Sequence, residues 1–381
     1  MNDYKSLTIS LILEKFDLIK EEKANEKRLL LKESLEGKKL CLFGTGHLGH
    51  RAYLLLKTLG YKVEYFCDNN SMKWDQIIID DILCISPERL SELGNTFVVI
   101  SLGDVDKVYN QLVKMGIKDT CKHLCEYFSL NQNEIFSFNK QKIINNLYVL
   151  FDILADDQSK KIIYWKMKAL LSTKEELKDI SYSEIFSEQI YIPGDIIEID
   201  NNAVIVDCGA FDGDTLEYIS SNLGIDGFKN YLCFELNKDN YQKLRERVNN
   251  HLNAIADKVE LYNFGVSDKK EKILYNNDSN ASKKTYAGTI EGLLCTLDAF
   301  LEARKIDYIK MDIEGSELLA LKGAKRLIER NKPQLAICLY HRITDLWNVP
   351  FLLHEFCSEY KIYIRHHSLM QNETVCYAVI P

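Results

Sequence analysis

The chain has 381 residues, of which 46% are hydrophobic and 27% charged, and its formal net charge is −8. This length suits two domains, and the acidic balance argues against duplex nucleic acid as a partner, because that binding depends on Lys and Arg. No segment approaches the roughly twenty apolar residues of a membrane span, and residues 1–10 lack the basic-then-apolar order of a secretory signal. We therefore expect a cytoplasmic protein without a nucleic-acid partner or a membrane span, and homo-oligomer formation stays an open alternative.

Residues 1–36 carry apolar side chains at helical spacing on both sides of the charged run Lys20–Lys27. This pattern predicts two surface helices without chemistry of their own. The cysteines are scattered, and the cluster Cys121, His123 and Cys125 lacks the second half of a zinc motif. We predict no metal site there.

Residues 37–128 have the pattern of a Rossmann-like domain. The strand expected at Lys39–Phe43 is followed by a glycine turn, a helix and a second strand that ends before Asp68. In such a turn the amides of the helix N-terminus face an anion and the acid faces a ribose. The candidate nucleotide-binding residues are Gly44, Gly46, Gly49 and Asp68.

Residues 129–200 read as a helical connector to the second domain, because apolar side chains recur at helical spacing and no glycine turn occurs before Pro193-Gly194. Its aromatic residues are candidates for a substrate pocket, although such side chains are more often core. They are Tyr164, Trp165, Tyr182, Phe186 and Tyr191.

A second strand, glycine turn and helix begin at Ala203. The apolar run Ala203–Val206 predicts a buried parallel strand, and Asp207 follows at its carboxyl end. Gly209 and Gly213 allow a tight turn and a close approach of the backbone to a ligand. Ligands bind at such strand ends in open α/β sheets.

The acids around this turn indicate the kind of ligand. Asp207, Asp212 and Asp214 would repel a pyrophosphate, but they suit a cationic, hydroxyl-rich ligand such as S-adenosylmethionine. A second apolar run ends in Glu235, whose carboxylate can accept hydrogen bonds from ribose hydroxyls.

Residues 201–381 continue as alternating strands and helices. A third strand over 259–264 leads to Asp268, at a loop placed to meet an adenine edge, and residues 269–293 read as a polar, mobile substrate loop. Further strands precede Asp312 and His341, and a terminal hairpin follows. The predicted fold class is α/β with two Rossmann-like domains, the second a seven-stranded class I methyltransferase fold with a C-terminal antiparallel hairpin.

Two resemblances to known families support this interpretation. The motifs FGTGHLGH, YFCDNN, Ile85-Ser-Pro87 and Val98–Asp104 resemble the N-terminal domain of bacterial sugar O-acyltransferases. That resemblance implies a nucleotide-sugar ligand for the first domain, and a domain used only for packing or dimerisation is the alternative. VIVDCGAFDGDT, YLCFELNKDNY, CTLDAFL and IDYIKMDIEGSELLALKGA resemble the FkbM-type methyltransferase family over roughly residues 150–381.

The FkbM resemblance implies an S-adenosylmethionine-dependent O-methyltransferase that acts on a hydroxyl of a sugar or glycan precursor. It places Glu235 at the ribose and Asp268 at the adenine side, although the proline that usually follows this acid is missing from Phe234–Asn237. The residues that would hold the methionine moiety lie in the second turn: Asp207, Gly209, Ala210, Asp212, Gly213 and Thr215.

The expected mechanism is in-line displacement with a general base, because a sulfonium methyl needs chiefly an aligned nucleophile. His341 is the candidate base, Asp312 would orient the acceptor hydroxyl or the cofactor amine, and Glu314 would contact the substrate. Glu317 is assigned to structure, as an acid in the first turn of a helix. A divalent cation held by Asp312 and Glu314 is an alternative that we do not favour.

Two other classes stay open. One is a nucleotide-sugar-binding protein whose methyltransferase fold is not catalytic. The other is an oxidoreductase that uses the first domain with NAD, but no catalytic Tyr-x-x-x-Lys motif follows the first glycine turn.

Overall fold

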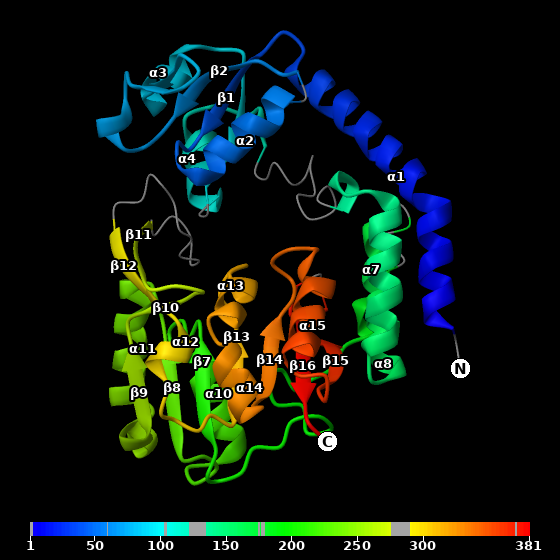
Figure 1. Cartoon of the computed structure of the whole chain (residues 1–381). Helices are drawn as coiled ribbons and strands as arrows, with labels where there is room; N and C mark the ends of the chain where they lie inside the picture. The colour runs from blue at the N-terminus through cyan, green and yellow to red at the C-terminus, as the bar shows by residue number, and fades with distance from the viewer. Residues whose placement is uncertain are drawn as a thin grey trace. The chain divides into compact units, whose positions relative to one another are not determined.

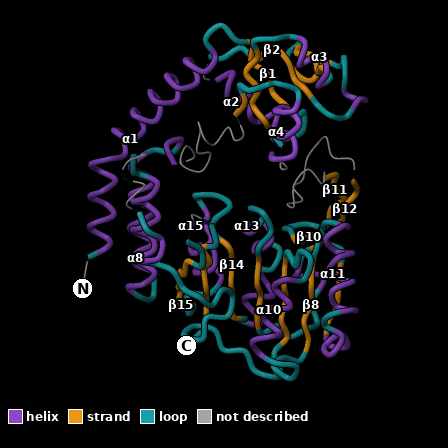
Figure 2. The backbone as a smooth tube through the Cα atoms, turned by 180° about the vertical axis from the view of Figure 1, so that it is seen from behind, coloured by secondary structure: helices purple, strands orange, loops and turns teal. Residues whose placement is uncertain are grey.

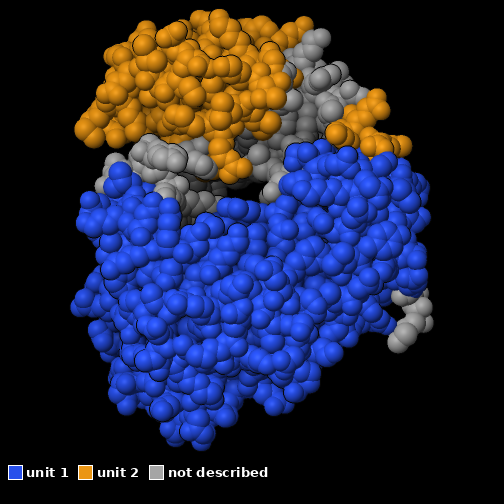
Figure 3. All heavy atoms as spheres, in the orientation of Figure 1, with its two compact units in different colours: residues 1–16, 134–274, 290–381 blue, residues 17–133, 275–289 orange. Residues whose placement is uncertain are grey.

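The structure is a computed structural model that describes residues 3–58, 60–102, 105–121, 135–173, 176, 180–275, 290–369 and 372–381. Gly103, Asp104, His123 and Cys125 lie outside these ranges. The chain divides into a large unit, residues 1–16, 134–274 and 290–381, and a small unit, residues 17–133 and 275–289 (Figure 3). The expected connector therefore belongs to the same compact unit as the second domain.

The N-terminal segment is one helix, α1 (Tyr4–Leu35), and the expectation of two helices was wrong. The charged run Lys20–Lys27 holds neither Gly nor Pro and consists mainly of good helix formers, so nothing in it ends the helix. Near its start, α1 packs on the connector, where the rings of Phe16 and Phe136 lie 5.1 Å apart.

The small unit has a six-stranded sheet in the order β3-β4-β2-β1-β5-β6. The pairings between its described strands are parallel except that of β3 with β4, which confirms the Rossmann-like prediction. The strands are β1 (Lys39–Phe43), β2 (Val63–Cys67), β3 (Ile77–Ile79), β4 (Ile82–Ile85), β5 (Thr96–Ile100) and β6 (Thr120–Cys121). The helical elements are α2 (His47–Thr58), η1 (Ser71–Lys73), α3 (Pro87–Glu92) and α4 (Val105–Lys114).

The large unit is built on a seven-stranded sheet in the order β15-β16-β14-β13-β7-β8-β9 (Figure 1). Strands β7, β8, β9, β13 and β14 pair in parallel, and β16 is antiparallel to both of its neighbours. This order confirms the class I methyltransferase fold with its terminal hairpin. The strands are β7 (Val204–Cys208), β8 (Asn230–Phe234), β9 (Val259–Tyr262), β13 (Tyr308–Met311), β14 (Gln334–Cys338), β15 (Lys361–His366) and β16 (Thr374–Val379).

Helices flank this sheet, as the tube view shows (Figure 2). They are α7 (Lys140–Ile153), α8 (Asp157–Leu170), η2 (Tyr182–Glu184), α10 (Asp214–Leu223), α11 (Lys238–Asn250), η3 (Asn253–Lys258), α12 (Leu297–Phe300), α13 (Glu317–Lys322), α14 (Lys325–Asn331) and α15 (Asp345–Phe356). No helix within the described ranges has both the length and the apolar character needed to cross a membrane.

Helix α8 of the connector is attached to the edge of the large sheet. Helix α8 lies against β15, where the Ile364 amide donates to Ser159 Oγ at 2.8 Å. Arg365, whose side chain is 7% exposed, pairs with Asp156 at 2.7 Å. This contact holds the start of α8, where Asp156 is the N-cap, against the sheet.

Part of the expected substrate loop is regular structure. Strands β11 (Glu271–Tyr275) and β12 (Ile290–Cys295) form a three-stranded sheet with β10 (Gly265–Val266). The missed signal is the alternation in β11, where Ile273 and Tyr275 are buried and Lys272 and Leu274 are exposed. Residues 276–289, where a mobile loop was also expected, lie outside the described residues.

The topology brings the carboxyl ends of four strands together. From β7 the chain adds β8 and β9 on one side, and later β13 and β14 on the other. The strand order therefore reverses between β7 and β13, which is where open α/β sheets bind ligands. Gly209, Glu235, Asp312 and His341 follow β7, β8, β13 and β14 at this edge.

Candidate functional site

The glycines of the second turn are required by the packing of the chain on itself. Gly209 has φ 81°, and a Cβ there would lie 1.9 Å from the carbonyl oxygen of Asp312. Gly213 has φ 92°, and a Cβ there would lie 2.9 Å from Leu244 Cδ1 on α11. From the sequence, we expected these glycines to allow a close approach to a ligand. The groups that approach them in the structure are the end of β13 and helix α11.

Asp207 is fully buried and paired inside the sheet. Lys310 Nζ, on the adjacent strand β13, lies 2.9 Å from Asp207 Oδ1, and Tyr231 Oη donates to Oδ2 at 3.1 Å. Lys310 also donates to the Gly209 carbonyl at 2.8 Å. Burial alone would lower the pKa of Lys310, but the carboxylates of Asp207 and Asp312 outweigh it and raise that pKa. Asp207 therefore acts on the glycine turn through Lys310.

Sequence reasoning missed Lys310, although a lysine in the middle of a buried strand is a visible signal. Its side chain is 2% exposed, and a buried ammonium requires a charged partner. Asp207 is that partner.

The other acid of the turn, Asp212, is also engaged. Arg247 on α11 contacts Asp212 Oδ2 at 2.8 Å and forms a second ion pair with Glu217 on α10. These contacts clamp the turn between two helices. Ala210 and Thr215, which were also expected to contact the cofactor, are buried in this turn.

The Glu235 carboxylate accepts two backbone amides and can still accept hydrogen bonds from ribose hydroxyls. It accepts the Phe211 amide on Oε2 at 3.0 Å and the Asn237 amide on Oε1 at 2.7 Å. A carboxylate oxygen has two lone pairs, so each oxygen can accept one further hydrogen bond. Burial raises the pKa of Glu235 to about 7.

The missing proline after Glu235 is explained by a helix cap. Asn237 is the N-cap of α11, and its side chain accepts the amides of Asp239 and Asn240. The local turn is therefore stabilised by capping hydrogen bonds in place of a proline ring. Asp268, expected near adenine, is exposed in the loop after β10.

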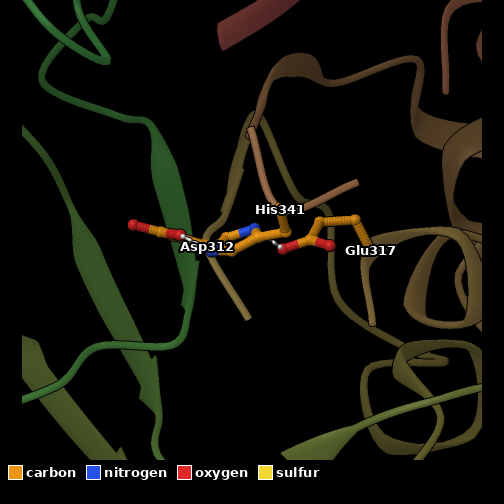
Figure 4. Close-up of side chains that lie close together, drawn as sticks. All are labelled: Asp312, Glu317 and His341. Atoms are coloured by element: carbon orange, nitrogen blue, oxygen red, sulfur yellow. Dashed lines mark ion pairs between the residues drawn. The ribbon is translucent and has the colours of Figure 1, made fainter. Parts of the chain in front are cut away.

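His341 lies between carboxylates at the ends of β13 and β14. Figure 4 shows its ring with Asp312 on one side and Glu317 on the other. Nε2 lies 3.5 Å from Asp312 Oδ1 and 3.6 Å from Glu314 Oε2, and Nδ1 lies 3.1 Å from Glu317 Oε1. The His341 side chain is 8% exposed, and neither ring nitrogen has a partner in good hydrogen-bond geometry among the described residues.

The charges around His341 favour its protonated form. Burial alone would lower the pKa of His341, but Glu317, Asp312 and Glu314 together raise it above the ordinary value. Glu317 is fully buried, and its Oε1 also accepts the amides of Ile313 and Gly315. Its assignment to structure alone was incomplete, because it faces the Nδ1 side of the imidazole.

Two tyrosines hold the Asp312 carboxylate. Tyr340 Oη donates to Oδ1 at 2.9 Å and lies 3.0 Å from Oδ2, while Tyr191 Oη donates to Oδ2 at 3.1 Å. Tyr340 was not singled out from the sequence, and Tyr191 was one of five aromatic candidates in the connector. No local pattern could separate it from the other four, because its contact spans 121 positions of the chain.

Two more acids surround this edge. Glu314 is 41% exposed and has φ 59°, a left-handed conformation that is uncommon away from glycine. Burial raises the pKa of Glu373, and the charges of Asp312 and Asp214 add to that effect. Glu373 precedes β16 and was missed, because nothing in the sequence relates the hairpin to the glycine turn.

Three side chains at this edge are close enough together to be considered as metal ligands. Asp312, Glu317 and His341 offer donor atoms that lie within 4.8 Å of one another, a spacing compatible with a metal ion. The two carboxylates, however, face different nitrogens of one ring. If a cation bound one ring nitrogen, the carboxylate beside the other nitrogen would accept the ring N–H and would not bind the metal. The arrangement therefore suits proton transfer better than chelation.

The first glycine turn is closed by its own acid. Asp68 accepts the Thr45 amide at 3.1 Å, the Thr45 hydroxyl at 2.6 Å and Lys73 Nζ at 3.0 Å, all on Oδ2, and the Asn70 amide at 3.0 Å on Oδ1. These donors outweigh burial and lower the pKa of Asp68. Its position after β2 is as expected, but its hydrogen bonds are made within the chain.

Comparison with known proteins gives a family match over the residues of the second site. Residues 207–369 match the methyltransferase FkbM domain. A crystal structure of methyltransferase FkbM from Methylobacillus flagellatus KT has 22% sequence identity and a TM-score of 0.56, and the match covers 94% of this chain and 99% of that one. It supports the fold, including residues beyond the matched domain. No curated protein matches the chain.

Two further solved structures are similar at TM-scores too low to carry an argument. A putative methyltransferase from Streptococcus mutans in complex with SAH has 13% identity and a TM-score of 0.30, covering 54% of this chain and 98% of that one. A putative tRNA (m1A22) methyltransferase from Streptococcus pneumoniae in complex with S-adenosyl-L-methionine has 14% identity and a TM-score of 0.29, covering 47% and 65%. Residues 207–369 thus form an FkbM methyltransferase domain, and the protein is an S-adenosylmethionine-dependent methyltransferase.

Proposed function

We propose that this protein is an O-methyltransferase that transfers a methyl group to a hydroxyl of a sugar or glycan precursor. The observation that carries the proposal is the position of His341, a buried imidazole between carboxylates at the edge where the strand order reverses. Hydroxyl methylation requires removal of a proton, and a histidine held in this way can accept one. The resemblance to FkbM-type enzymes supports the sugar as the class of acceptor.

In this proposal the second glycine turn binds the cofactor. Glu235 would accept the two ribose hydroxyls on its remaining lone pairs, and the backbone of residues 209–213 would hold the methionine moiety. Asp207 and Asp212 act indirectly, because Lys310 and Arg247 already hold their carboxylates. Thr215 and Ala210 support the turn, and Asp268 lies on the adenine side.

When bound, S-adenosylmethionine supplies an electrophilic methyl group. The acceptor oxygen would bond to this methyl carbon as the bond from sulfur to carbon breaks, which leaves the hydroxyl proton to be removed. His341 Nε2 takes the hydroxyl proton, while Glu317 stabilises the imidazolium from the Nδ1 side. Asp312 and Glu314 orient the acceptor on the Nε2 side.

The pH dependence follows from the raised pKa of His341. A base must be unprotonated, so kcat/KM should rise with pH through a value above the ordinary histidine pKa of about 6.5. An optimum on the alkaline side of neutrality is expected. A rate that is flat from pH 6 to 9 would contradict His341 as the base.

The proposal is tested in two steps. Calorimetric titration with S-adenosylhomocysteine should show saturable binding to the native chain. Transfer of a labelled methyl group from S-adenosylmethionine should then be measured against free sugars, glycosides and nucleotide-sugars, with and without a chelator. Absence of binding would contradict the cofactor site, and binding without transfer to any hydroxyl acceptor would contradict the proposed reaction. Loss of transfer only with the chelator would favour the cation alternative.

The small unit has a separate candidate role. Its resemblance to the nucleotide-sugar-binding domain of sugar O-acyltransferases is the support for a ligand at Gly44, Gly46 and Gly49. We propose that Asp68 closes the turn and does not contact a ribose, because four donors already surround its carboxylate. Titration of UDP-sugars into the Asp68→Asn variant and the native chain tests both points.

A further inference from the structure

Tyr191 is a residue outside the matched domain whose backbone is held in an unfavourable conformation. Its φ is 64°, in the left-handed region that bulky side chains avoid. Such a conformation costs on the order of 1–3 kcal/mol and persists only where surrounding contacts impose it. Strain of this kind is often found at functional sites.

Two tyrosine hydroxyls hold the Tyr191 backbone from both sides. Its amide donates to Tyr377 Oη at 2.9 Å, and its carbonyl accepts from Tyr308 Oη at 2.7 Å. Tyr308 is on β13 and Tyr377 is on β16, and both are fully buried. Both polar groups of this one residue are thus satisfied by the sheet that carries the site.

Tyr377 is itself oriented by a histidine. Its hydroxyl lies 2.9 Å from His367 Nε2, and His367 Nδ1 lies 2.8 Å from the Ser187 carbonyl. A carbonyl only accepts, so the network assigns the ring proton to Nδ1 and leaves Nε2 to accept from Tyr377. The Tyr377 oxygen is then free to accept the Tyr191 amide. Ser187 and Tyr191 belong to the same segment, so the contacts form a closed chain.

In this arrangement the Tyr191 hydroxyl donates a hydrogen bond to Asp312 Oδ2 at 3.1 Å. The residue is 7% exposed, and Lys310 Nζ lies 5.2 Å from the centre of its ring. Tyr340 donates to Oδ1, the oxygen of Asp312 that lies 3.5 Å from His341 Nε2. Tyr340 Oη also lies 3.0 Å from Oδ2, so the two tyrosines together fix the carboxylate in the orientation that it presents to the imidazole.

We infer that Tyr191 is a positioning residue for methyl transfer, which sets the Asp312 carboxylate against His341. The inference rests on the proposed function and extends the active site to a segment N-terminal to residues 207–369. Tyr191 touches neither reacting atom in this scheme; it acts through Asp312.

The test is Tyr191→Phe, which removes only the hydroxyl. Tyr360→Phe is the matched control, because Tyr360 is also buried and donates one hydrogen bond, to the Pro333 carbonyl at 2.7 Å. We expect Tyr191→Phe to lower kcat about 5- to 20-fold, and to change the affinity for S-adenosylhomocysteine less than about twofold. Tyr360→Phe should leave kcat within about twofold of the native value.

Two measurements separate positioning from a structural role. In an Asp312→Asn background, Tyr191→Phe should have little additional effect on kcat, because the group through which it acts is already altered. The pKa of His341, followed by NMR of labelled histidine with His341→Gln for assignment, should rise further in Tyr191→Phe. The freed carboxylate can then turn towards the imidazolium. Tyr360→Phe should leave the pKa of His341 unchanged.

The inference is overturned if Tyr191→Phe leaves kcat and the pKa of His341 at their native values, or if its effects match those of Tyr360→Phe. Additive losses in the Asp312→Asn background would also overturn it. The histidine titration needs no acceptor, so it reports on Tyr191 even where no methyl transfer is found. Failure of the native chain to bind S-adenosylhomocysteine would count against the proposed function instead.

Discussion

The two glycine turns of this protein occupy the same place in the order of strands and helices, and they differ in their chemistry. Each follows a buried parallel strand, each opens a helix, and each is followed by a strand that ends in an acid, Asp68 in the small unit and Glu235 in the large unit. The Asp68 carboxylate accepts three donors on one oxygen and one on the other. Glu235 accepts one backbone amide on each oxygen and keeps a lone pair on both.

The strands beside the two turns also differ. Next to β7, β13 ends at Asp312, and β14 is followed by His341. Next to β1, β5 is followed by Ser101 and Leu102, which carry no ionisable group. A glycine turn is therefore a way to close a strand onto a helix, and its chemistry depends on which side chains the neighbouring strands bring to the same edge.

The largest effect is expected from His341→Gln. Loss of the base should lower kcat by roughly 10²- to 10⁴-fold. The affinity for S-adenosylhomocysteine should change little, since His341 lies on the acceptor side. His251→Gln, at the exposed end of α11, is the control. If the His341→Gln enzyme kept its activity, His341 would not be the base, and the main chemical difference proposed between the two turns would not hold.

Alanine at Gly209 or Gly49 should destabilise the unit that contains it. In each case the new Cβ would lie 1.9 Å from a backbone carbonyl oxygen, that of Asp312 or that of Gly44. We expect losses of about 2–4 kcal/mol in the free energy of unfolding, and only Gly209→Ala should also weaken S-adenosylhomocysteine binding. Scanning calorimetry with and without this ligand measures both.

Gly224→Ala is the matched control for that comparison. Gly224 has φ 81°, but a Cβ there would have no atom within 4 Å. With ψ 173° its backbone lies in a region almost restricted to glycine, so its replacement should cost only this backbone strain, about 1–3 kcal/mol. If all three variants lose the same stability, steric contact with the carbonyls is not the reason for the glycines.

Replacing the two acids compares the turns directly. Glu235→Ala should weaken S-adenosylhomocysteine binding about tenfold or more, since hydrogen bonds to a charged group contribute about 1.5–3 kcal/mol. Asp68→Ala should leave that affinity unchanged and instead lower the stability of the small unit by about 1–3 kcal/mol, because buried donors lose their acceptor. Equal effects of the two substitutions on binding would contradict the assignment of the cofactor to the large unit.

The smallest effect is a pH dependence of binding. Glu235 has a pKa of about 7 without ligand, and ribose hydroxyls bind its ionised form. Affinity should therefore rise about tenfold between pH 6 and 8, with release of a proton on binding. The pKa of Glu235 is raised in the folded state, so the stability of the folded protein without ligand falls as pH rises through 7. Ligand binding offsets this loss.

Calorimetry in two buffers of different ionisation enthalpy measures the released proton. Glu235→Gln should bind weakly and show no rise in affinity over this pH range. A native affinity that is independent of pH would mean that Glu235 is already ionised, or that it does not contact the ligand.

Much of the site was predictable, because it consists of residues that directly follow buried strands. Glu235, Asp312 and His341 were placed at one edge from the strand pattern alone, and the structure brings them to that edge. The exception among the acids was Glu317. As a residue in the first turn of α13 it looked like a favourable helix charge, and only the fold shows that its carboxylate is buried beside His341.

The sequence by itself determined the class of the fold, the two strand-turn-helix units and the strand-end residues, because periodicity and glycine chemistry are local. Tertiary structure alone decided which polar groups are already satisfied. Asp68 and Glu235 are alike in sequence, and they differ because Thr45 and Lys73 occupy one carboxylate. Tyr191 reaches Asp312 across 121 positions, and no local pattern encodes a contact made by the closing of the sheet.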